Sequence, residues 1–126
     1  MRIVLLGTSA AMPTLTRGLS ATAVVREGDV FLFDCGEGTQ IQLMRAGVKR
    51  SRIHSIFIGH MHGDHLYGIA GLLSTMNLDG REEPLNVFGP EGIRISQRVV
   101  PEFRFAAVHF QANRAGISAR LSRTCG

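Results

Sequence analysis

A dense cluster of metal-ligand residue types, His-Met-His-Gly-Asp-His at residues 60–65, constrains this chain more than any other feature of its sequence. It follows the apolar, β-branched run 54–58, which predicts a strand, and it precedes a helical pattern over 66–77. In an extended backbone His60 and His62 project to the same side, so two imidazoles can meet one ion. The cluster therefore predicts a metal site at the end of a strand.

The second half of the cluster predicts a second ion. The chain turns at Gly63, which places Asp64 and His65 at the start of the following helix. Neutral imidazole with carboxylate suits zinc, with manganese or iron as alternatives. Two neighbouring ions lower the pKa of a shared water toward ~7 and hold both oxygens of a displaced phosphate. This pattern favours a two-metal hydrolase over a hydrogen-bonded histidine turn or an adventitious surface metal site.

A glycine-flanked turn after the predicted strand 30–33 carries another carboxylate, Asp34. Such a carboxylate can accept the spare N–H of a metal-bound histidine and fix its tautomer; the alternative is that Asp34 only caps its turn. Cys35 is interpreted as a small buried residue rather than a ligand. The isolated His54 and His109 are assigned no function.

Strands and helices alternate along the chain, which predicts an α/β layered fold. Strands are expected at 3–6, 21–26, 30–33, 54–58 and 85–88, and helices from about 39 to 47, over 66–77 and over 91–100. A hairpin turn with a positive φ at Gly28 is expected between the second and third strands. Thr39 is the expected cap of its helix, Gly47 its stop, and Ile41 and Met44 fall at helical spacing.

Composition excludes several classes of protein. With 44% hydrophobic and 19% charged residues, the chain is neither disordered nor collagen-like. Two cysteines are too few for a disulfide-stapled secreted scaffold. No apolar stretch approaches the ~18 residues of a membrane span. The apolar run near the N-terminus is broken by small polar residues, which favours a buried strand over a signal peptide and makes the cytoplasm the expected compartment.

The net charge of +4 belongs to the end of the chain. Basic and acidic residues balance over 1–102, and the excess is carried by Arg104, Arg114, Arg120 and Arg123. The segment 103–126 contains no acid, and its Arg, Ala, Gly and Ser content is typical of an off-frame reading of GC-rich DNA. We therefore predict a basic tail over 103–126 that is not native to the fold; the alternative is a tail that holds RNA phosphates.

Four sequence blocks together resemble the metallo-β-lactamase superfamily, and within it the ribonuclease Z family of endonucleases that trim the 3′ end of precursor tRNA. The blocks are 6–14, 33–40, 58–73 and 88–93, and the resemblance runs from residue 1 to about residue 99. It implies that residues 1–102 form the N-terminal half of a metallo-β-lactamase αβ/βα four-layer sandwich.

The resemblance also implies roles for individual residues. His60 and His62 would bind one zinc ion, and Asp64 and His65 the other, with Asp64 also the proton acceptor in catalysis. Asp34 would support the ligands.

Arg17 resembles the basic substrate loop of the family, although Gly18 stands where asparagine is common.

A complete member of the family supplies a further histidine, a bridging aspartate, a final histidine and an arm that grips tRNA, and nothing after His65 matches them. The resemblance implies precursor tRNA as a partner, two zinc ions, a homodimer and no membrane. The leading hypothesis is a zinc-dependent endoribonuclease that leaves a 3′ hydroxyl, present as an incomplete fragment with little activity of its own. The alternatives are a hydrolase of a small ester, thioester or lactam in the same superfamily, and a non-catalytic fragment.

Overall fold

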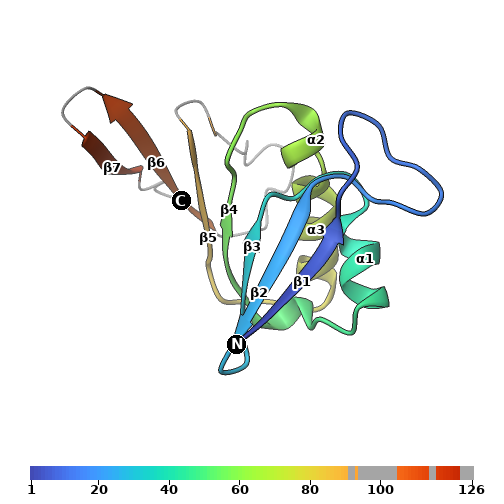
Figure 1. The fold of residues 1–126 in the computed structure, drawn as a ribbon. Coiled ribbons are helices and arrows are strands. Elements are labelled where there is room, and N and C mark those ends of the chain that lie inside the picture. Colours follow the sequence, from blue (N-terminus) through green and yellow to red (C-terminus); the bar gives the residue numbers. More distant parts are fainter. Residues whose placement is uncertain (91–92, 94–104, 114–115, 123–126) are drawn as a thin grey trace.

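The computed structural model of the chain describes residues 1–90, 93, 105–113 and 116–122. In this part the chain forms one seven-stranded sheet whose strands lie in sequence order (Figure 1). The strands are β1 (Arg2–Gly7), β2 (Ala21–Arg26), β3 (Asp29–Phe33), β4 (Ile53–Phe57), β5 (Leu85–Pro90), β6 (Phe105–Asn113) and β7 (Gly116–Ser122). The helices are α1 (Thr39–Arg45), α2 (Gly63–Leu66), α3 (Gly68–Leu78) and the 3₁₀ turn η1 (Arg50–Arg52).

The sheet is mixed, and its connections explain why. Strands β1, β2 and β3 are antiparallel, β3 to β6 run parallel, and β7 returns antiparallel to β6. The β2–β3 hairpin turns through Glu27 and Gly28, both at positive φ (52° and 92°), as the tight turn of a twisted hairpin requires. Parallel neighbours need longer crossovers, which α1 and α3 supply. The predicted α/β architecture is confirmed.

Helices α1 and α3 cover one face of the sheet, and the hydrophobic core lies between them (Figure 1). The expected apolar stripe of α3 is buried, and it packs against alternate residues of the central strands. These buried residues are Ile69, Leu72, Leu73 and Met76 on α3, and Leu32, Ile56 and Val87 on the strands. Burial of Leu32, Ile56 and Val87 fixes the register of β3, β4 and β5, because a one-residue slip of a strand would turn its side chain away from the helices.

The opposite face of the sheet carries an aromatic ladder. The rings of Phe33 and Phe57 stack at 5.1 Å, and those of Phe57 and Phe88 at 4.8 Å, across three strands in register. Ile3 and Leu5 of β1 are exposed on this face. The sheet is therefore apolar on both sides, whereas helices cover only one of them in the part of the chain that is described.

Helix α1 corrects two expectations at its start and along its length. Its N-cap is Gly38, at φ 83°, whereas the Thr39 hydroxyl donates to the Gly36 carbonyl at 2.6 Å. The turn needs a left-handed residue immediately before the helix, and glycine takes that conformation without strain. Ile41 and Met44 are exposed, because a helix of seven residues buries only one side, here carrying Thr39 and Leu43.

The C-terminus of α1 follows the prediction. Gly47 lies at φ 65° and donates to the Met44 carbonyl, while Val48 donates to the Leu43 carbonyl. These two bonds are those of a Schellman motif, which satisfies the last carbonyls of a helix.

Two expectations concern the end of the chain. The helix expected over 91–100 lies outside the described residues, apart from Ile93, which is buried. Within the predicted tail 103–126, β6 pairs in parallel with β5, and β7 pairs with β6. The side chains of its four arginines also lie outside the described residues, so its foreign origin stays a prediction. No helix among the described residues has the length and apolarity of a membrane span.

A matched pair of glycines in α3 tests how closely this helix packs. A Cβ at Gly68 would lie 2.0 Å from the Gly36 carbonyl oxygen, whereas one at Gly71 would lie 3.3 Å from the flexible Gln40 side chain. We expect Gly68→Ala to lower the free energy of unfolding by at least about 2 kcal/mol, because backbone must move. Gly71→Ala should stay within about 1 kcal/mol of wild type, since alanine favours the helix. Urea unfolding followed by circular dichroism measures both, and equal effects would contradict the packing.

Candidate metal centre

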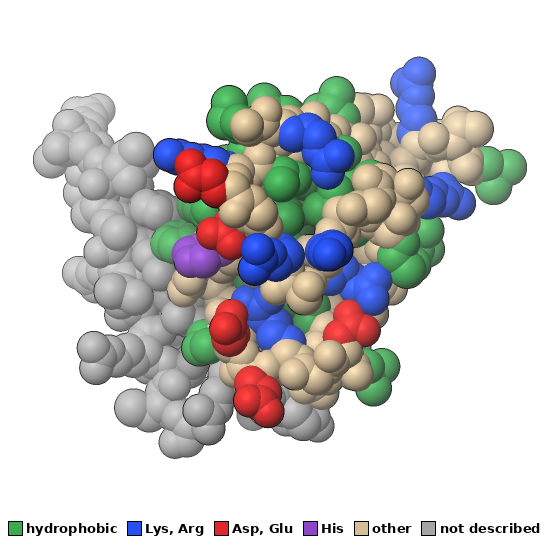
Figure 2. Space-filling view, turned by 90° about the horizontal axis from the view of Figure 1, so that it is seen from below, with side chains coloured by type: hydrophobic (Ala, Val, Ile, Leu, Met, Phe, Trp, Pro, Cys, Tyr) green, Lys and Arg blue, Asp and Glu red, His purple; other side chains and the backbone are tan. Residues whose placement is uncertain are grey.

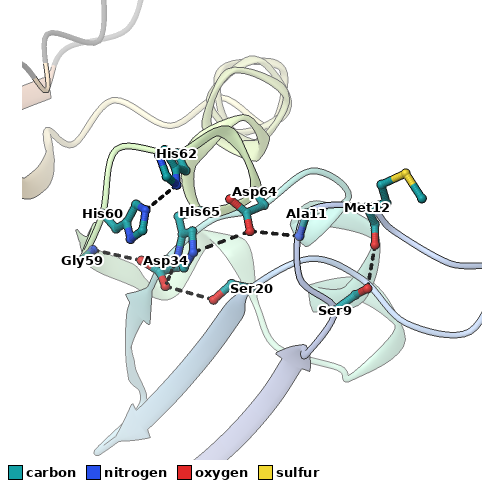
Figure 3. Close-up of polar contacts among 10 residues, drawn as sticks. All are labelled: Ser9, Ala11, Met12, Ser20, Asp34, Gly59, His60, His62, Asp64 and His65. Carbon is teal, nitrogen blue, oxygen red and sulfur yellow. Dashed lines mark hydrogen bonds and ion pairs between the residues drawn. The ribbon is translucent and has the colours of Figure 1, made fainter.

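The predicted ligands meet at the carboxyl ends of two parallel strands (Figure 3). Asp34 directly follows β3, and residues 59–62 follow β4 and lead into α2. Carboxyl ends of neighbouring parallel strands lie at one edge of a sheet, where ligand sites of α/β folds gather. His62 occupies the N-cap position of α2 in an extended conformation, so the chain changes direction immediately after it. The local backbone therefore brings four side chains from residues 60–65 to one edge.

His60 and His62 lie side by side, as the extended spacing predicts. His60 Nε2 and His62 Nδ1 are 2.6 Å apart, and both rings are exposed. The His60 ring also stacks on that of His65 at 4.7 Å, with an interplanar angle of 5°. A hydrogen bond between two imidazoles holds one proton between two nitrogens, and a metal ion replaces that proton when both nitrogens bind it. The pair can supply two ligands to one ion.

Asp34 is bonded to groups from three segments of the chain. Its Oδ2 accepts from the Ser20 hydroxyl at 2.9 Å and lies 2.7 Å from His65 Nδ1, while its Oδ1 accepts from the Gly59 amide at 2.9 Å. A carboxylate on Nδ1 selects the tautomer that carries its proton there and leaves a lone pair on Nε2. His65 Nε2 in turn lies 3.7 Å from Asp64 Oδ2. Asp34 thus contacts and orients His65, which forms the second pair of donors with Asp64.

Asp64 receives a backbone hydrogen bond that sequence reasoning missed. The amide of Ala11 donates to Asp64 Oδ2 at 3.1 Å, and Ala11 lies at φ 61° (Figure 3). This bond is the main cause that lowers the pKa of the Asp64 carboxyl below its ordinary value, and nearby His65 acts in the same direction. A main-chain donor 53 residues away leaves no side-chain signal in a sequence. The Ala11 amide therefore favours the ionised form of the Asp64 carboxyl and fixes the orientation of its Oδ2.

The donors fit a metal in chemistry but meet as two pairs. Imidazole nitrogens and a carboxylate are ligands that zinc accepts. Among the described residues, however, no three His, Cys, Asp or Glu side chains converge closely enough to hold one ion. Each pair could supply two of the four ligands of a tetrahedral ion, and such an ion would need further ligands to complete its sphere.

The other candidate residues lie apart from these pairs. Arg17 is exposed, and its amide donates to the Thr14 hydroxyl at 3.0 Å within its own turn, with no described contact to the ligands. Cys35 is fully buried, and burial raises the pKa of its thiol to about 12, which keeps it protonated. His54 lies at the other end of β4, where its Nδ1 contacts the Ser55 hydroxyl at 2.8 Å.

Comparison with known proteins finds related sequences over the first three quarters of the chain. A family model described as "Anti-Pycsar protein Apyc1" matches residues 1–96. A protein named Ribonuclease Z from Prochlorococcus marinus (strain MIT 9301) is 51% identical over 96 residues, covering 75% of this chain and 31% of the relative. One of the same name from Salinibacter ruber is 52% identical over 99 residues, covering 79% and 31%.

Some alignments and structures reach further. Ribonuclease Z of Methanothermobacter thermautotrophicus is 42% identical over 113 residues, or 90% of this chain and 37% of the relative. The crystal structure of the short form of human tRNase Z is 43% identical with a TM-score of 0.75, covering 83% of this chain and 42% of that one. The metallo-β-lactamase fold protein YhfI of Bacillus subtilis has a TM-score of 0.74 at 18% identity, covering 89% and 46%. The chain spans about a third of the length of these curated relatives.

The contact between Asp34 and His65 is open to a direct test. We expect Asp34→Asn to weaken zinc or cobalt binding by the chain about 10- to 100-fold, because an amide no longer holds the His65 tautomer with a charge-assisted bond. Asp29→Asn, at the other end of β3, is the matched control and should leave affinity unchanged. Competition with a chromophoric chelator measures both, and equal affinities for wild type and Asp34→Asn would contradict the supporting role.

The buried thiol of Cys35 gives a second prediction. Its pKa rises from 9.0 to about 12 on folding, so the folded state keeps its proton as pH rises through 9, and stability falls from that pH upward. At pH 8 the native thiol should resist alkylation by iodoacetamide and react only when urea unfolds the chain. Peptide mapping by mass spectrometry separates Cys35 from Cys125. Rapid alkylation of native Cys35 at pH 8 would show that the site is open.

Proposed function

The chain belongs to the family described as Anti-Pycsar protein Apyc1 and has the N-terminal part of a metallo-β-lactamase fold, and from this premise we propose that it carries the metal-binding half of an endoribonuclease that processes precursor tRNA. The relatives named Ribonuclease Z and the human tRNase Z structure support the nuclease assignment, since they share 42–52% of the aligned residues. The reaction proposed is hydrolysis of a phosphodiester at the 3′ side of the tRNA, leaving a 3′ hydroxyl.

One observation supports the proposal most directly. Two pairs of donor side chains, His60 with His62 and Asp64 with His65, lie at one sheet edge, and the Asp34 carboxylate contacts His65. The His60–His62 nitrogens are 2.6 Å apart, and Asp34 contacts His65, whose other nitrogen faces Asp64. Structural histidine clusters rarely need a dedicated carboxylate that sets a tautomer, whereas metal sites use one routinely. This arrangement supports metal-assisted hydrolysis over a merely structural turn.

We assign the residues as follows. His60 and His62 hold one zinc ion, and Asp64 and His65 hold the other. When bound, zinc supplies Lewis acidity that activates a water near neutral pH and stabilises charge on a phosphate. Asp34 keeps the proton of His65 on Nδ1, so that Nε2 stays free to bind. Asp64, which the amide of Ala11 orients, accepts the proton released in the hydrolysis.

We also propose a contact with the substrate, an oligomeric state and the bounds of the catalytic half-domain. Arg17, exposed in the loop that also carries Ala11, contacts the RNA backbone. The complete protein acts as a homodimer in the cytoplasm. Residues 1–102 form the catalytic half-domain, and 103–126 are foreign to it. The remaining metal ligands come from outside residues 60–65.

A chimera tests the proposed activity. The aligned N-terminal residues of this chain, joined to the rest of the Salinibacter ruber relative, should cleave a precursor tRNA and lose cleavage in EDTA. In that chimera Asp64→Ala should lower kcat/KM about 10³-fold or more, because it removes a metal ligand and the proton acceptor together. Glu82→Ala, an exposed carboxylate at the far end of the sheet, should cleave normally.

Three outcomes separate the hypotheses. Near-normal cleavage by the Asp64→Ala chimera would contradict the assigned roles. A folded chimera that hydrolyses a small ester, thioester or lactam but no tRNA would support the alternative hydrolase. Residues 1–126 alone should show little cleavage, since two pairs of ligands hold metal weakly. Robust zinc-dependent cleavage by the chain alone would contradict that expectation.

A further inference from the structure

A polar cavity lies at the opposite end of the sheet from the candidate metal centre. It has a volume of about 280 Å³ and is lined where β3, β4 and β5 begin, beside η1. The five residues of β4 rise about 3.3 Å each, so roughly 16 Å of strand separates this cavity from the histidine cluster. None of its lining residues belongs to the metal centre.

Arg81 is built into the cavity wall in a fixed orientation. Its Nε donates to the Glu83 carbonyl at 2.9 Å, and its two terminal nitrogens donate to the carbonyls of Ser51 and Pro84 at 3.5 and 3.3 Å. Its hydrogen-bond partners are neutral carbonyls, which orient the guanidinium, while the nearby Glu83 carboxylate also interacts with its charge. A guanidinium has five N–H groups, which leaves two for a ligand. Such a preformed fork suits the oxygens of a phosphate.

Arg52 supplies the second cation. Its Nη2 lies 2.8 Å from the point where a Cβ at Gly28 would stand, so the glycine turn leaves the room that this guanidinium fills. Among the described residues, no carboxylate lies within 4.0 Å of either Arg52 or Arg81 in an ion pair, although Asp29 and Glu83 also line the cavity. Neither guanidinium is therefore held in an ion pair with a described residue, and both can meet an added anion.

His54 and Asn86 add further polar groups to the lining. His54 contacts the Ser55 hydroxyl through Nδ1, which leaves Nε2 for another partner, and its ring lies 5.5 Å from that of Phe31. Asn86 adds an amide. Figure 2 shows this end of the molecule, where lysine and arginine side chains gather in the middle with a histidine beside them.

We propose that this cavity binds one phosphate group, carried either by a free mononucleotide or by the backbone of an RNA. Two guanidinium groups that are not in ion pairs with described residues, one of them fixed by backbone carbonyls, provide the charge and the fork geometry. The volume is at the lower end for small-molecule sites, which suits a phosphate with its sugar rather than a dinucleotide. The carboxylates of Asp29 and Glu83 lower the local positive potential and so disfavour a triphosphate.

Calorimetric titration of the whole chain tests this proposal. Inorganic phosphate, AMP and a ten-nucleotide oligouridine serve as separate titrants in metal-free buffer, because phosphate would otherwise also bind a loaded metal centre. We expect saturable binding of AMP or RNA that weakens at least fivefold in Arg52→Gln and in Arg81→Lys. Arg26→Gln, which removes the same charge from the neighbouring hairpin outside the cavity, should change affinity less than twofold.

The outcomes are distinct. Tighter binding of oligouridine than of AMP assigns the phosphate to an RNA backbone, and equal binding assigns it to a free nucleotide. Amide NMR shifts confined to residue 29, residues 51–54 and residues 81–86 on titration would support the cavity. Because Arg81 also ties two loops together, Arg52→Gln carries the test if Arg81→Lys lowers the melting temperature. Absence of saturable binding by all three titrants, or equal weakening in Arg26→Gln, overturns the proposal.

Discussion

The carboxylate of Asp34 is the contact on which the candidate site depends. It joins the segment before β2, the end of β4 and the start of α2 through Ser20, Gly59 and His65. The Asp34 amide also donates to the Phe57 carbonyl, which continues the β3–β4 pairing one residue beyond the strand. Charge-assisted bonds to one ionised group are stronger than neutral ones and hold their partners in fixed directions. A single side chain therefore bonds three segments at the sheet edge, alongside main-chain bonds from Cys35 to His65 and from Gly36 to Ser20.

Much of this arrangement can be read from the sequence, because its causes are local. Alternation at residues 60 and 62 predicts two imidazoles on one side, and the α3 stripe predicts which face is buried. Contacts made by backbone groups are different. The amide of Ala11 reaches Asp64 through a loop conformation that no residue type demands, and Gly38 rather than Thr39 caps α1 because the turn geometry decides. Side-chain chemistry can be recognised from the residue types in a sequence, whereas these backbone contacts depend on the path of the main chain and cannot.

The distribution of charge on the molecule could also be predicted only in part from the sequence. Basic and acidic residues balance over 1–102, so a sum over the sequence assigns the positive excess to the tail alone. Folding brings the charged side chains of this segment to different ends of the sheet. The turn η1 brings Arg52 to one end of the sheet, the loop before β5 adds Arg81, and Asp79 pairs with Arg50 instead of either. A balanced segment thus presents unpaired cations at one end and acid-supported histidines at the other, which net charge cannot express.

Backbone strain points to the same edge as the polar contacts. In the part of the chain that is described, three residues other than glycine have positive φ: Ala11, Glu27 and Asp34. Glu27 belongs to a hairpin turn that requires this conformation. The other two each cost about 1–2 kcal/mol and persist because surrounding bonds hold them, Ala11 through Asp64 and Asp34 through its three partners. Asp64 is thus held by the backbone amide of Ala11, and His65 by the side-chain carboxylate of Asp34. An ion bound as proposed would therefore meet Asp64 and His65 already arranged by these contacts.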